Sequence, residues 1–512
     1  MNTPTCPLII LCALTFPFSV RADVHLASLF QDHAVIQRDQ ALPVWGTGDP
    51  GEAVRVEFRG QAASTTTGSD GKWLVRLKPM SGSAEPAVLR VTGKNRLTVA
   101  DLLTGDVWLA SGQSNMEFRV EQGDNAKAEI AAAQHPQIRQ FDVPNLVATS
   151  PRTDTAGHWE VCSPATVAKF SAVAYYFARD WQQATGMPVG IINSTWGGTP
   201  VESWMSARTL DSNPAFQPTL ARWQKTLAEY PEKKVEYDTA LSQWEKEDAA
   251  ARGAGVKTQA AFRKAHPKPR APRGPGHHWT PAGLYNGMIA PLAPYALDGA
   301  IWYQAESNAD HPAEYTALFE AMIRQWRQEW GRELPFYFVQ IANFAGTAID
   351  RAPGEWAWLR DAQTRALALP GTGMAVTIDI GTPGNIHPKN KQDVGRRLAL
   401  IGRHELLGEK IEFSGPAMVS VTREGAKLRV NFSHATGLTA GGESPLAFEI
   451  AGADHKFYPA QAEIEGESVL VSTPGIPEPV AVRYAWTNAP EAHLKNAAGL
   501  PASPFRSDDW AD

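Results

Sequence analysis

Hydrophobic and polar positions alternate in short runs along the first part of the chain. Apolar residues recur at every second position in runs 54–58 and 73–77, and the turn sequence Gly48-Asp49-Pro50-Gly51 precedes the first of them. Short β-type runs separated by turn signals predict a small β-sandwich-like domain over 23–104. Similar runs return at 428–432 and 469–472. They predict a second β-sandwich-like domain over 411–512.

The pattern changes near residue 106, where apolar strands begin to alternate with amphipathic helical stretches. The predicted strands are 107–110, 189–193, 299–304, 335–340 and 375–380, and the predicted helices are 171–183, 314–330 and 392–407. Such alternation implies a mostly parallel sheet flanked by helices. Residues 105–410 are therefore predicted to form an α/β domain, between the two β domains.

A charged stretch over 213–275 interrupts the α/β pattern. It is rich in Lys, Glu and Ala and becomes rich in Pro and Arg near 266–275. We interpret it as a helical insertion followed by an exposed loop. Its charges are expected to face solvent, with a partner-binding surface as the alternative.

Length and charge restrict the possible functions. At 512 residues the chain exceeds the roughly 250–300 residues that one hydrophobic core serves, so several domains are expected. A net charge of −6 provides no basic field for phosphates, which argues against a nucleic-acid partner.

The start of the chain is apolar. The uncharged run 7–20 ends at Val20-Arg21-Ala22 and predicts a signal peptide over 1–22, with a buried first strand as the alternative. The mature protein is then exported to the periplasm or secreted. No later stretch reaches the roughly 20 apolar residues of a membrane helix. Cleavage leaves Cys162 as the one cysteine, which argues against an internal disulfide and against thiolate metal sites.

One serine directly follows a predicted strand. Ser114 lies in Ser111-Gly112-Gln113-Ser114-Asn115-Met116, at the carboxyl edge of the sheet, where open α/β proteins bind their ligands. Gly112 permits a tight turn, and the backbone N–H after it can face an oxyanion. The segment alone fits a helix cap as well as a nucleophile.

Further segments supply what a nucleophilic serine needs. His387 lies between the predicted strand 375–380 and a predicted helix, and is the candidate base. Gly197 and Gly198 follow another strand and can offer backbone N–H groups, while Asn308 can donate its side-chain amide. Each signal is weak alone, because structural turns and loop-stabilising residues have the same composition.

The order of these residues resembles that of the four conserved blocks of the SGNH hydrolases. The wording is most similar to the sialate O-acetylesterase branch of that superfamily: Gly-Gln-Ser-Asn-Met at 112–116, Asn-Ser-Thr-Trp-Gly-Gly at 193–198, Trp-Tyr-Gln-Ala-Glu-Ser-Asn at 302–308 and Ile-His-Pro-Lys-Asn-Lys at 386–391. The resemblance extends from about residue 29 to residue 510. It implies an SGNH-type parallel sheet and a carbohydrate esterase activity.

The resemblance also implies roles for individual residues. Ser114 attacks an acetyl carbonyl, His387 carries the proton, and the oxyanion is held by the backbone of Ser114, by Gly197 or Gly198, and by Asn308. Neither metal nor organic cofactor is required. The residues expected to contact the sugar are Gln113, Trp196, Tyr285, Asn286, Gln304, Glu306 and Arg351.

Two positions depart from the family pattern. Many SGNH enzymes place an acid three residues before the catalytic histidine, but here that position is Gly384. Asp379 is the candidate replacement, and a backbone carbonyl that leaves a Ser–His dyad is the alternative. Ala305 stands where relatives commonly have glycine, which narrows the loop that carries Asn308.

Three functional hypotheses follow. The first is an O-acetylesterase acting on O-acetylated sialic acid, and the second is an acetylesterase acting on plant polysaccharide fragments such as xyloglucan or xylan. The third is a carbohydrate-binding protein that keeps the fold without catalysis. The presence of nucleophile, base and oxyanion donors favours an enzyme.

Overall fold

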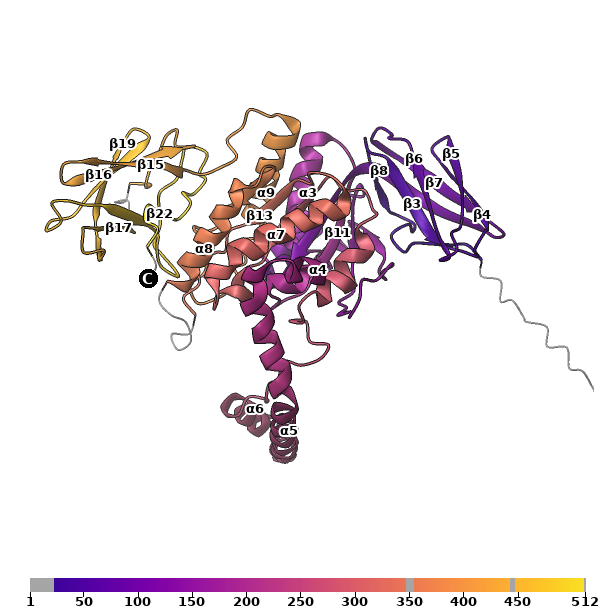
Figure 1. Cartoon of the computed structure of the whole chain (residues 1–512), viewed down its shortest axis with the longest axis horizontal. Helices are drawn as coiled ribbons and strands as arrows, with labels where there is room; N and C mark the ends of the chain where they lie inside the picture. Colours follow the sequence, from indigo (N-terminus) through magenta and orange to yellow (C-terminus); the bar gives the residue numbers. More distant parts are fainter. Residues whose placement is uncertain (1–22, 347–353, 443–446, 511–512) are drawn as a thin grey trace, which may run out of the picture.

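The computed structural model describes residues 23–346, 354–442 and 447–510, so the predicted signal peptide and Arg351 lie outside the described residues. An α/β region occupies the middle of the molecule, with β-rich regions at opposite ends and a helical arm projecting from the middle (Figure 1).

The amino-terminal β region consists of two packed sheets. One has the order β1-β3-β6, and in the other β4 pairs with β5 and β7, while β2 and β7 pair with the start of β8. Alternating burial in β4 and β6 confirms that their apolar positions face the core. The strands are β1 (His25–Leu26), β2 (Val35–Gln37), β3 (Leu42–Thr47), β4 (Ala53–Phe58), β5 (Gln61–Thr66), β6 (Lys72–Leu77), β7 (Ser83–Thr92) and β8 (Arg96–Gly112).

Strand β8 joins the two regions. Its first half pairs with β7, and its second half pairs in parallel with β11 and β12 of the central sheet. The expected boundary between residues 104 and 105 therefore falls within one continuous strand. The nucleophile segment at its end is tied to both sheets.

The central sheet has the order β10-β9-β11-β8-β12-β13-β14, parallel except for β10. The chain adds β9 and β11 on one side of β8 and then β12, β13 and β14 on the other. β8 therefore lies at the switch point of the sheet. The strands are β9 (Ile138–Asp142), β10 (Trp159–Val161), β11 (Val189–Thr195), β12 (Gly299–Tyr303), β13 (Phe336–Val339) and β14 (Thr372–Ala375).

Helices cover both faces of this sheet. Trp108 and Tyr337 point to one face, where Trp108 contacts Phe177 and Trp181 of α3. Trp302 points to the other and contacts Phe319 and Trp326 of α7. These aromatic contacts fix each helix on its strand face. The helices are α3 (Ala172–Thr185) and α9 (Gln392–Leu407), which pack together, and α7 (Pro312–Trp330) and α8 (Glu355–Arg365), which also pack together; α2 (Ala126–Ala132) and α4 (Ala207–Asp211) are short.

One predicted strand is placed differently. The apolar run 375–380 was expected to be a strand, but β14 covers Thr372–Ala375 and the chain leaves the sheet after it. Residues 376–378 are buried without ladder pairing, and Thr377 Oγ1 donates instead to the carbonyl of Gln340 at 2.6 Å. A buried apolar run outside a sheet has the same sequence pattern as a buried strand, which explains the wrong prediction.

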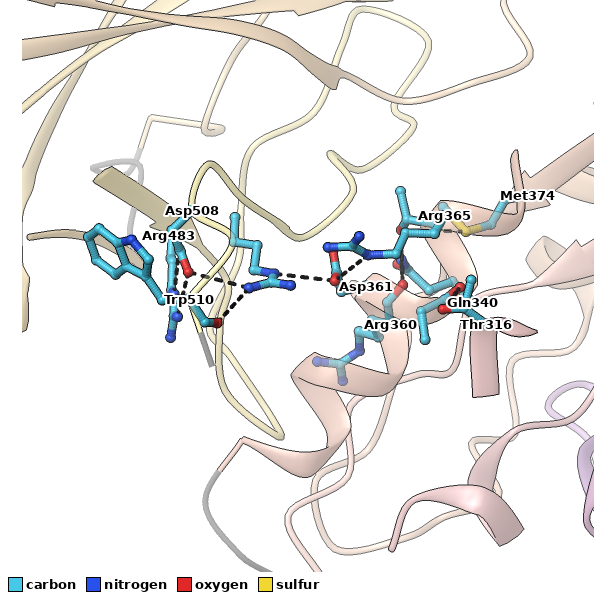
Figure 2. Close-up of polar contacts among 12 residues, drawn as sticks. Thr316, Gln340, Arg360, Asp361, Arg365, Met374, Arg483, Asp508 and Trp510 are labelled. Atoms are coloured by element: carbon cyan, nitrogen blue, oxygen red, sulfur yellow. Dashed lines mark hydrogen bonds and ion pairs between the residues drawn. The ribbon is translucent and has the colours of Figure 1, made fainter. Parts of the chain in front are cut away.

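The carboxyl-terminal β region contacts the α/β region through a partly buried network of ion pairs. Arg506 Nε lies 3.3 Å from Asp361 Oδ2 of α8, and its Nη1 lies 3.4 Å from Asp508, which also pairs with Arg483 (Figure 2). The sheets have the orders β15-β16-β20-β19 and β18-β17-β21-β22. Their strands are β15 (Ala417–Glu424), β16 (Lys427–Ser433), β17 (Phe448–Ala451), β18 (Phe457–Pro459), β19 (Gln461–Glu465), β20 (Ser468–Ser472), β21 (Ala481–Tyr484) and β22 (Phe505–Arg506).

The insertion forms the helical arm. It comprises α5 (Gln217–Gly253), which contains Pro231, and α6 (Val256–Ala265), which packs on α5. Thr219 is the one buried residue of α5, so this helix exposes almost its whole length. Within the described residues, no helix is both long and apolar enough to cross a membrane.

Candidate active site

The end of β8 places Ser114 at the carboxyl edge of the sheet, between β11 and β12. Gly112 has φ +131°, and a Cβ there would collide with the carbonyl oxygen of Tyr303. Only glycine permits this close approach. Gln113 N–H donates to that carbonyl at 2.9 Å, and Ser114 begins the short helix α1 (Ser114–Glu117). The serine is held at the position where such sheets bind ligands.

His387 reaches Ser114 from the loop after β14. Its Nε2 lies 2.8 Å from Ser114 Oγ, and both residues are partly exposed. Its backbone N–H donates to Asn385 Oδ1 at 3.0 Å, which helps to shape the loop. Burial lowers the pKa of His387, and the positive charge of Lys391 lowers it further. Both effects favour the neutral imidazole that a general base requires.

Asp379 does not orient His387. Its carboxylate forms a bidentate ion pair with Arg397 of α9, with Nη1–Oδ1 and Nη2–Oδ2 distances of 2.6 and 2.7 Å. This guanidinium satisfies both oxygens, which explains why the acid turns away from the histidine. In the described part of the chain no group hydrogen-bonds His387 Nδ1. The geometry is that of a Ser–His pair.

Gly197 lies next to Ser114, because a Cβ on Gly197 would be 3.2 Å from Ser114 Cβ. Its N–H donates to Glu117 Oε2 at 2.8 Å. Burial raises the pKa of Glu117, although the Gly197 N–H opposes that shift. Glu117 was missed by the sequence reasoning, because nothing in the motif indicates that its carboxylate occupies this donor. Gly198 has φ +69° and is exposed.

The Asn308 amide is held in a fixed orientation. Its Oδ1 accepts hydrogen bonds from Val201 N–H at 2.9 Å and from Gln304 Nε2 at 2.8 Å. Its Nδ2 donates one hydrogen to Glu202 Oε2 at 2.9 Å. An amide nitrogen carries two hydrogens. No described residue accepts the second hydrogen, which is therefore available to a ligand.

A buried polar network connects the segments that carry the site. Asn115 Nδ2 donates to Glu306 Oε1 at 2.6 Å and to the carbonyl of Ile386 at 2.9 Å, while Lys391 Nζ donates to Asn115 Oδ1 at 2.6 Å. Burial raises the pKa of Glu306 and lowers that of Lys391 to about 7. The network joins the neighbours of Ser114 and His387 to the loop of Asn308. It therefore fixes the distance between nucleophile and base.

The network changes the role expected for Glu306, which was predicted to contact the sugar. It is buried, and its carboxylate is held by Asn115. Gln113 and Gln304 are also buried. Gln113 Oε1 accepts from Ser307 N–H at 3.2 Å, and Gln304 Nε2 donates to the carbonyl of Thr199 at 3.0 Å. These three side chains stabilise the loops of the site through hydrogen bonds within the protein.

Two other predicted sugar contacts also lie in the protein interior. Tyr285 is buried, and its hydroxyl donates to Glu329 Oε1 at 2.7 Å. Asn286 is buried and donates to the carbonyl of Ala148 at 3.1 Å. Both are committed to folding contacts because their segment packs against α7 and against the loop that contains Ala148 and Arg152.

Trp196 stays beside the catalytic residues, partly exposed, with its ring 5.3 Å from that of His278. His278 stacks on His277, and Trp279 Nε1 donates to the carbonyl of Gly198 at 2.6 Å. This segment lies just after the expected insertion over 213–275 and was not predicted to belong to the site. The cluster of aromatic rings in His277-His278-Trp279 was the available signal.

A metal site is not suggested by the described residues, among which no group of three or more His, Cys, Asp or Glu side chains is arranged to hold an ion. Cys162 is buried, and burial raises the pKa of its thiol to about 12. Such a thiol is inert as a nucleophile.

Comparison with known proteins identifies the class of enzyme to which this chain is similar. Residues 104–241 and 275–401 match the family model described as "Carbohydrate esterase, sialic acid-specific acetylesterase". The crystal structure of a carbohydrate acetylesterase from Xanthomonas citri is similar, with 40% identity, a TM-score of 0.79, and coverage of 95% of this chain and 100% of the other. The fold is that of a carbohydrate esterase.

Curated relatives narrow the class. Sialate O-acetylesterase of Mus musculus is 30% identical over 94% of this chain and 93% of its own length. The Homo sapiens enzyme is 29% identical over 94% and 91%. The chain belongs to the sialic acid-specific acetylesterase family of carbohydrate esterases. It is a carbohydrate O-acetylesterase.

Proposed function

We propose that this chain is an SGNH-type serine hydrolase in which Ser114 and His387 act as a catalytic dyad. The observation that carries the proposal is the 2.8 Å contact between Ser114 Oγ and His387 Nε2 at the switch point of the sheet. A nucleophile within hydrogen-bond reach of a neutral base is the arrangement that acyl transfer requires.

The reaction has two balanced steps. Ser114 Oγ attacks the acetyl carbonyl while His387 Nε2 takes its proton, and the same proton then passes to the departing sugar oxygen. This step leaves the acetyl group on Ser114. Water next gives a proton to His387 and attacks the acetyl carbonyl, and return of that proton to Ser114 releases acetate.

Oxyanion stabilisation is assigned to the Ser114 N–H, the Gly197 N–H and the second hydrogen of Asn308 Nδ2. Glu117 accepts the Gly197 N–H in the absence of substrate, so its carboxylate must move before that donor can serve. Gly198 lies one residue further and is the alternative donor. Preorganised donors of this kind typically contribute about 10²–10³ in kcat each.

The proposed substrates are O-acetylated sugars of two sources. The curated relatives are sialate O-acetylesterases, which favours O-acetylated sialic acid. The alternative is acetylated plant polysaccharide fragments such as xyloglucan or xylan. The similar structure from Xanthomonas citri is that of a carbohydrate acetylesterase, a description that fits either source. A non-catalytic carbohydrate-binding role is disfavoured by the assembled Ser–His pair.

Acetate release tests the proposal directly. Purified protein is incubated with O-acetylated sialic acid and, separately, with acetylated xyloglucan or xylan oligosaccharides. Release from at least one supports the function, and the faster substrate identifies the source. Release from neither, with a correctly folded protein, contradicts it.

The wider organisation is proposed in the same terms. Residues 1–22 serve as a signal peptide that exports the enzyme to the periplasm or the medium. An SGNH-type catalytic domain over 105–410 lies between β-sandwich-like domains over 23–104 and 411–512. The amino-terminal sequence of the protein recovered from cells, beginning at Asp23 if cleavage follows Ala22, tests the first point.

A further inference from the structure

A cavity of about 330 Å³ lies where the helical arm joins the catalytic region. Its walls come from the first turns of α5, from the loop that returns to the α/β region, and from the turn after β12. Trp223 lies in the first wall. Arg273 and Trp279 lie in the second wall, and Ser307 and Asn308 lie in the third. Its volume lies in the range of small-molecule sites, about 300–1,000 Å³.

The cavity adjoins the catalytic residues. Asn308, whose amide is assigned to the oxyanion, forms part of its wall, and the neighbouring Ser307 N–H donates to Gln113, the residue before Ser114. On another side Trp279 donates to the carbonyl of Gly198 at 2.6 Å. A ligand in this cavity therefore contacts the loops that position the oxyanion donors.

Its lining combines flat apolar surfaces with hydrogen-bonding groups. The guanidinium of Arg273 lies 3.2 Å from the ring centre of Trp279, and in the described structure it has no hydrogen bond or ion pair to a carboxylate. Trp223 offers a second indole. Aromatic faces beside free donors suit a sugar ring, which has apolar C–H faces and hydroxyls at its edge.

The charges of the lining are balanced. Arg222 is held by Glu314, with Nη2–Oε2 at 2.6 Å, and Lys225 lies 3.8 Å from Glu229. Arg273, the remaining cation, lies in the field of two carboxylates, those of Asp310 and Glu202. No surplus positive charge remains for an anionic ligand. The lining favours hydroxyl groups, which both donate and accept hydrogen bonds.

We propose that this cavity is a subsite for an uncharged sugar unit, joined through the glycan chain to the sugar that carries the acetyl ester. The inference rests on the proposed esterase function and deepens it. It assigns the base of the insertion to substrate recognition and gives the enzyme a preference for acetylated neutral oligosaccharides over single acetylated sugars.

The test compares two substrates in the full-length mature protein. kcat/KM is measured with an acetylated neutral oligosaccharide, such as one from xyloglucan or xylan, and with an aryl acetate, which is too small to fill the cavity. The variants are Arg273→Met and Trp223→Ala. Trp244→Ala is the matched control, because this indole lies on the distal arm and donates to the carbonyl of His266.

The proposal predicts that each cavity variant lowers the ratio of the oligosaccharide value to the aryl acetate value about tenfold, corresponding to about 1.4 kcal/mol. Trp244→Ala leaves the ratio unchanged. Two variants are used so that misfolding of one does not decide the test.

Other outcomes are distinguishable. An unchanged ratio in both folded cavity variants overturns the subsite. Acetylated sialosides are then measured as a third substrate. A larger loss with them than with neutral oligosaccharides overturns the assignment to an uncharged sugar and favours a carboxylate on Arg273. Failure of the wild-type protein to hydrolyse either substrate rejects the esterase function itself.

Discussion

The catalytic edge of the sheet and the helical arm differ in how their polar residues are placed. At the edge, residues from four distant segments meet. Polar groups such as Lys391 and Glu306 are buried there, and both are hydrogen-bonded to Asn115. On the arm, α5 runs from Gln217 to Gly253 with Thr219 as its one buried residue. The comparison teaches that catalytic geometry is maintained by buried polar contacts, whereas the arm contributes only at its base.

The largest effect is expected from Ser114→Ala. Loss of the nucleophile should lower kcat for an aryl acetate by at least about 10³-fold, because the remaining groups stabilise an oxyanion but form no acyl-enzyme. Steady-state kinetics measure the loss. Ser212→Ala, on the exposed surface near the arm, is the control and should retain activity. Substantial turnover by the Ser114 variant would reject the nucleophile.

A smaller loss is expected from Lys391→Met. Removal of the ammonium frees Asn115 and should lower kcat about 10–100-fold while KM changes little. The control is Lys389→Met, an exposed neighbour.

The pH profile separates positioning from simple destabilisation. Lys391 lowers the pKa of His387, so its removal raises that pKa, and the acid limb of kcat/KM should move to higher pH. The charged groups near the Ser114–His387 pair are Lys391, Glu306 and Glu117. Because the variant leaves Glu306 buried without its cation, Lys391→Met/Glu306→Gln should recover thermal stability. An unmoved acid limb in a folded variant would contradict the electrostatic role.

Asp379→Asn is expected to change activity less than threefold. The carboxylate binds Arg397 and not His387, so its loss should mainly lower the melting temperature. Activity and thermal unfolding are measured on the same sample. A fall in kcat comparable to that of Ser114→Ala would restore Asp379 as the third member of a triad.

The smallest effect is expected from shortening the arm. Replacement of 235–264 by a short Gly-Ser linker keeps Trp223, Arg222 and the return loop. Since the removed residues contact chiefly one another, kcat/KM should stay within about twofold for both aryl acetate and oligosaccharide. A strong loss of kcat/KM with either substrate would show that the distal arm contributes to catalysis or substrate binding, contrary to the view that only its base contributes.

The sequence predicted those features that have a local pattern. The helices near α3, α7 and α9, the alternating β runs and the contact between Ser114 and His387 follow from periodicity and from the order of the motifs. The strand expected at 375–380 was misplaced, because a buried apolar run looks the same inside or outside a ladder.

The partners of polar side chains could not be predicted in this way. Asp379 lies near His387 in the sequence but pairs with Arg397, and Glu306 lies in a motif of the site but points into the interior. Glu117 meets Gly197 across 80 residues. Such contacts depend on how distant segments pack, and no local pattern records that.

The central claim is that Ser114, activated by His387, forms a covalent acyl-enzyme. A fluorophosphonate probe, which reacts with activated serine hydroxyls, tests it most directly when the labelled residue is located by peptide mass spectrometry. The account predicts labelling of Ser114 in parallel with loss of esterase activity, and none in His387→Ala. Full inactivation with the label on another residue would contradict it. Full esterase activity after labelling of Ser114 would contradict it as well.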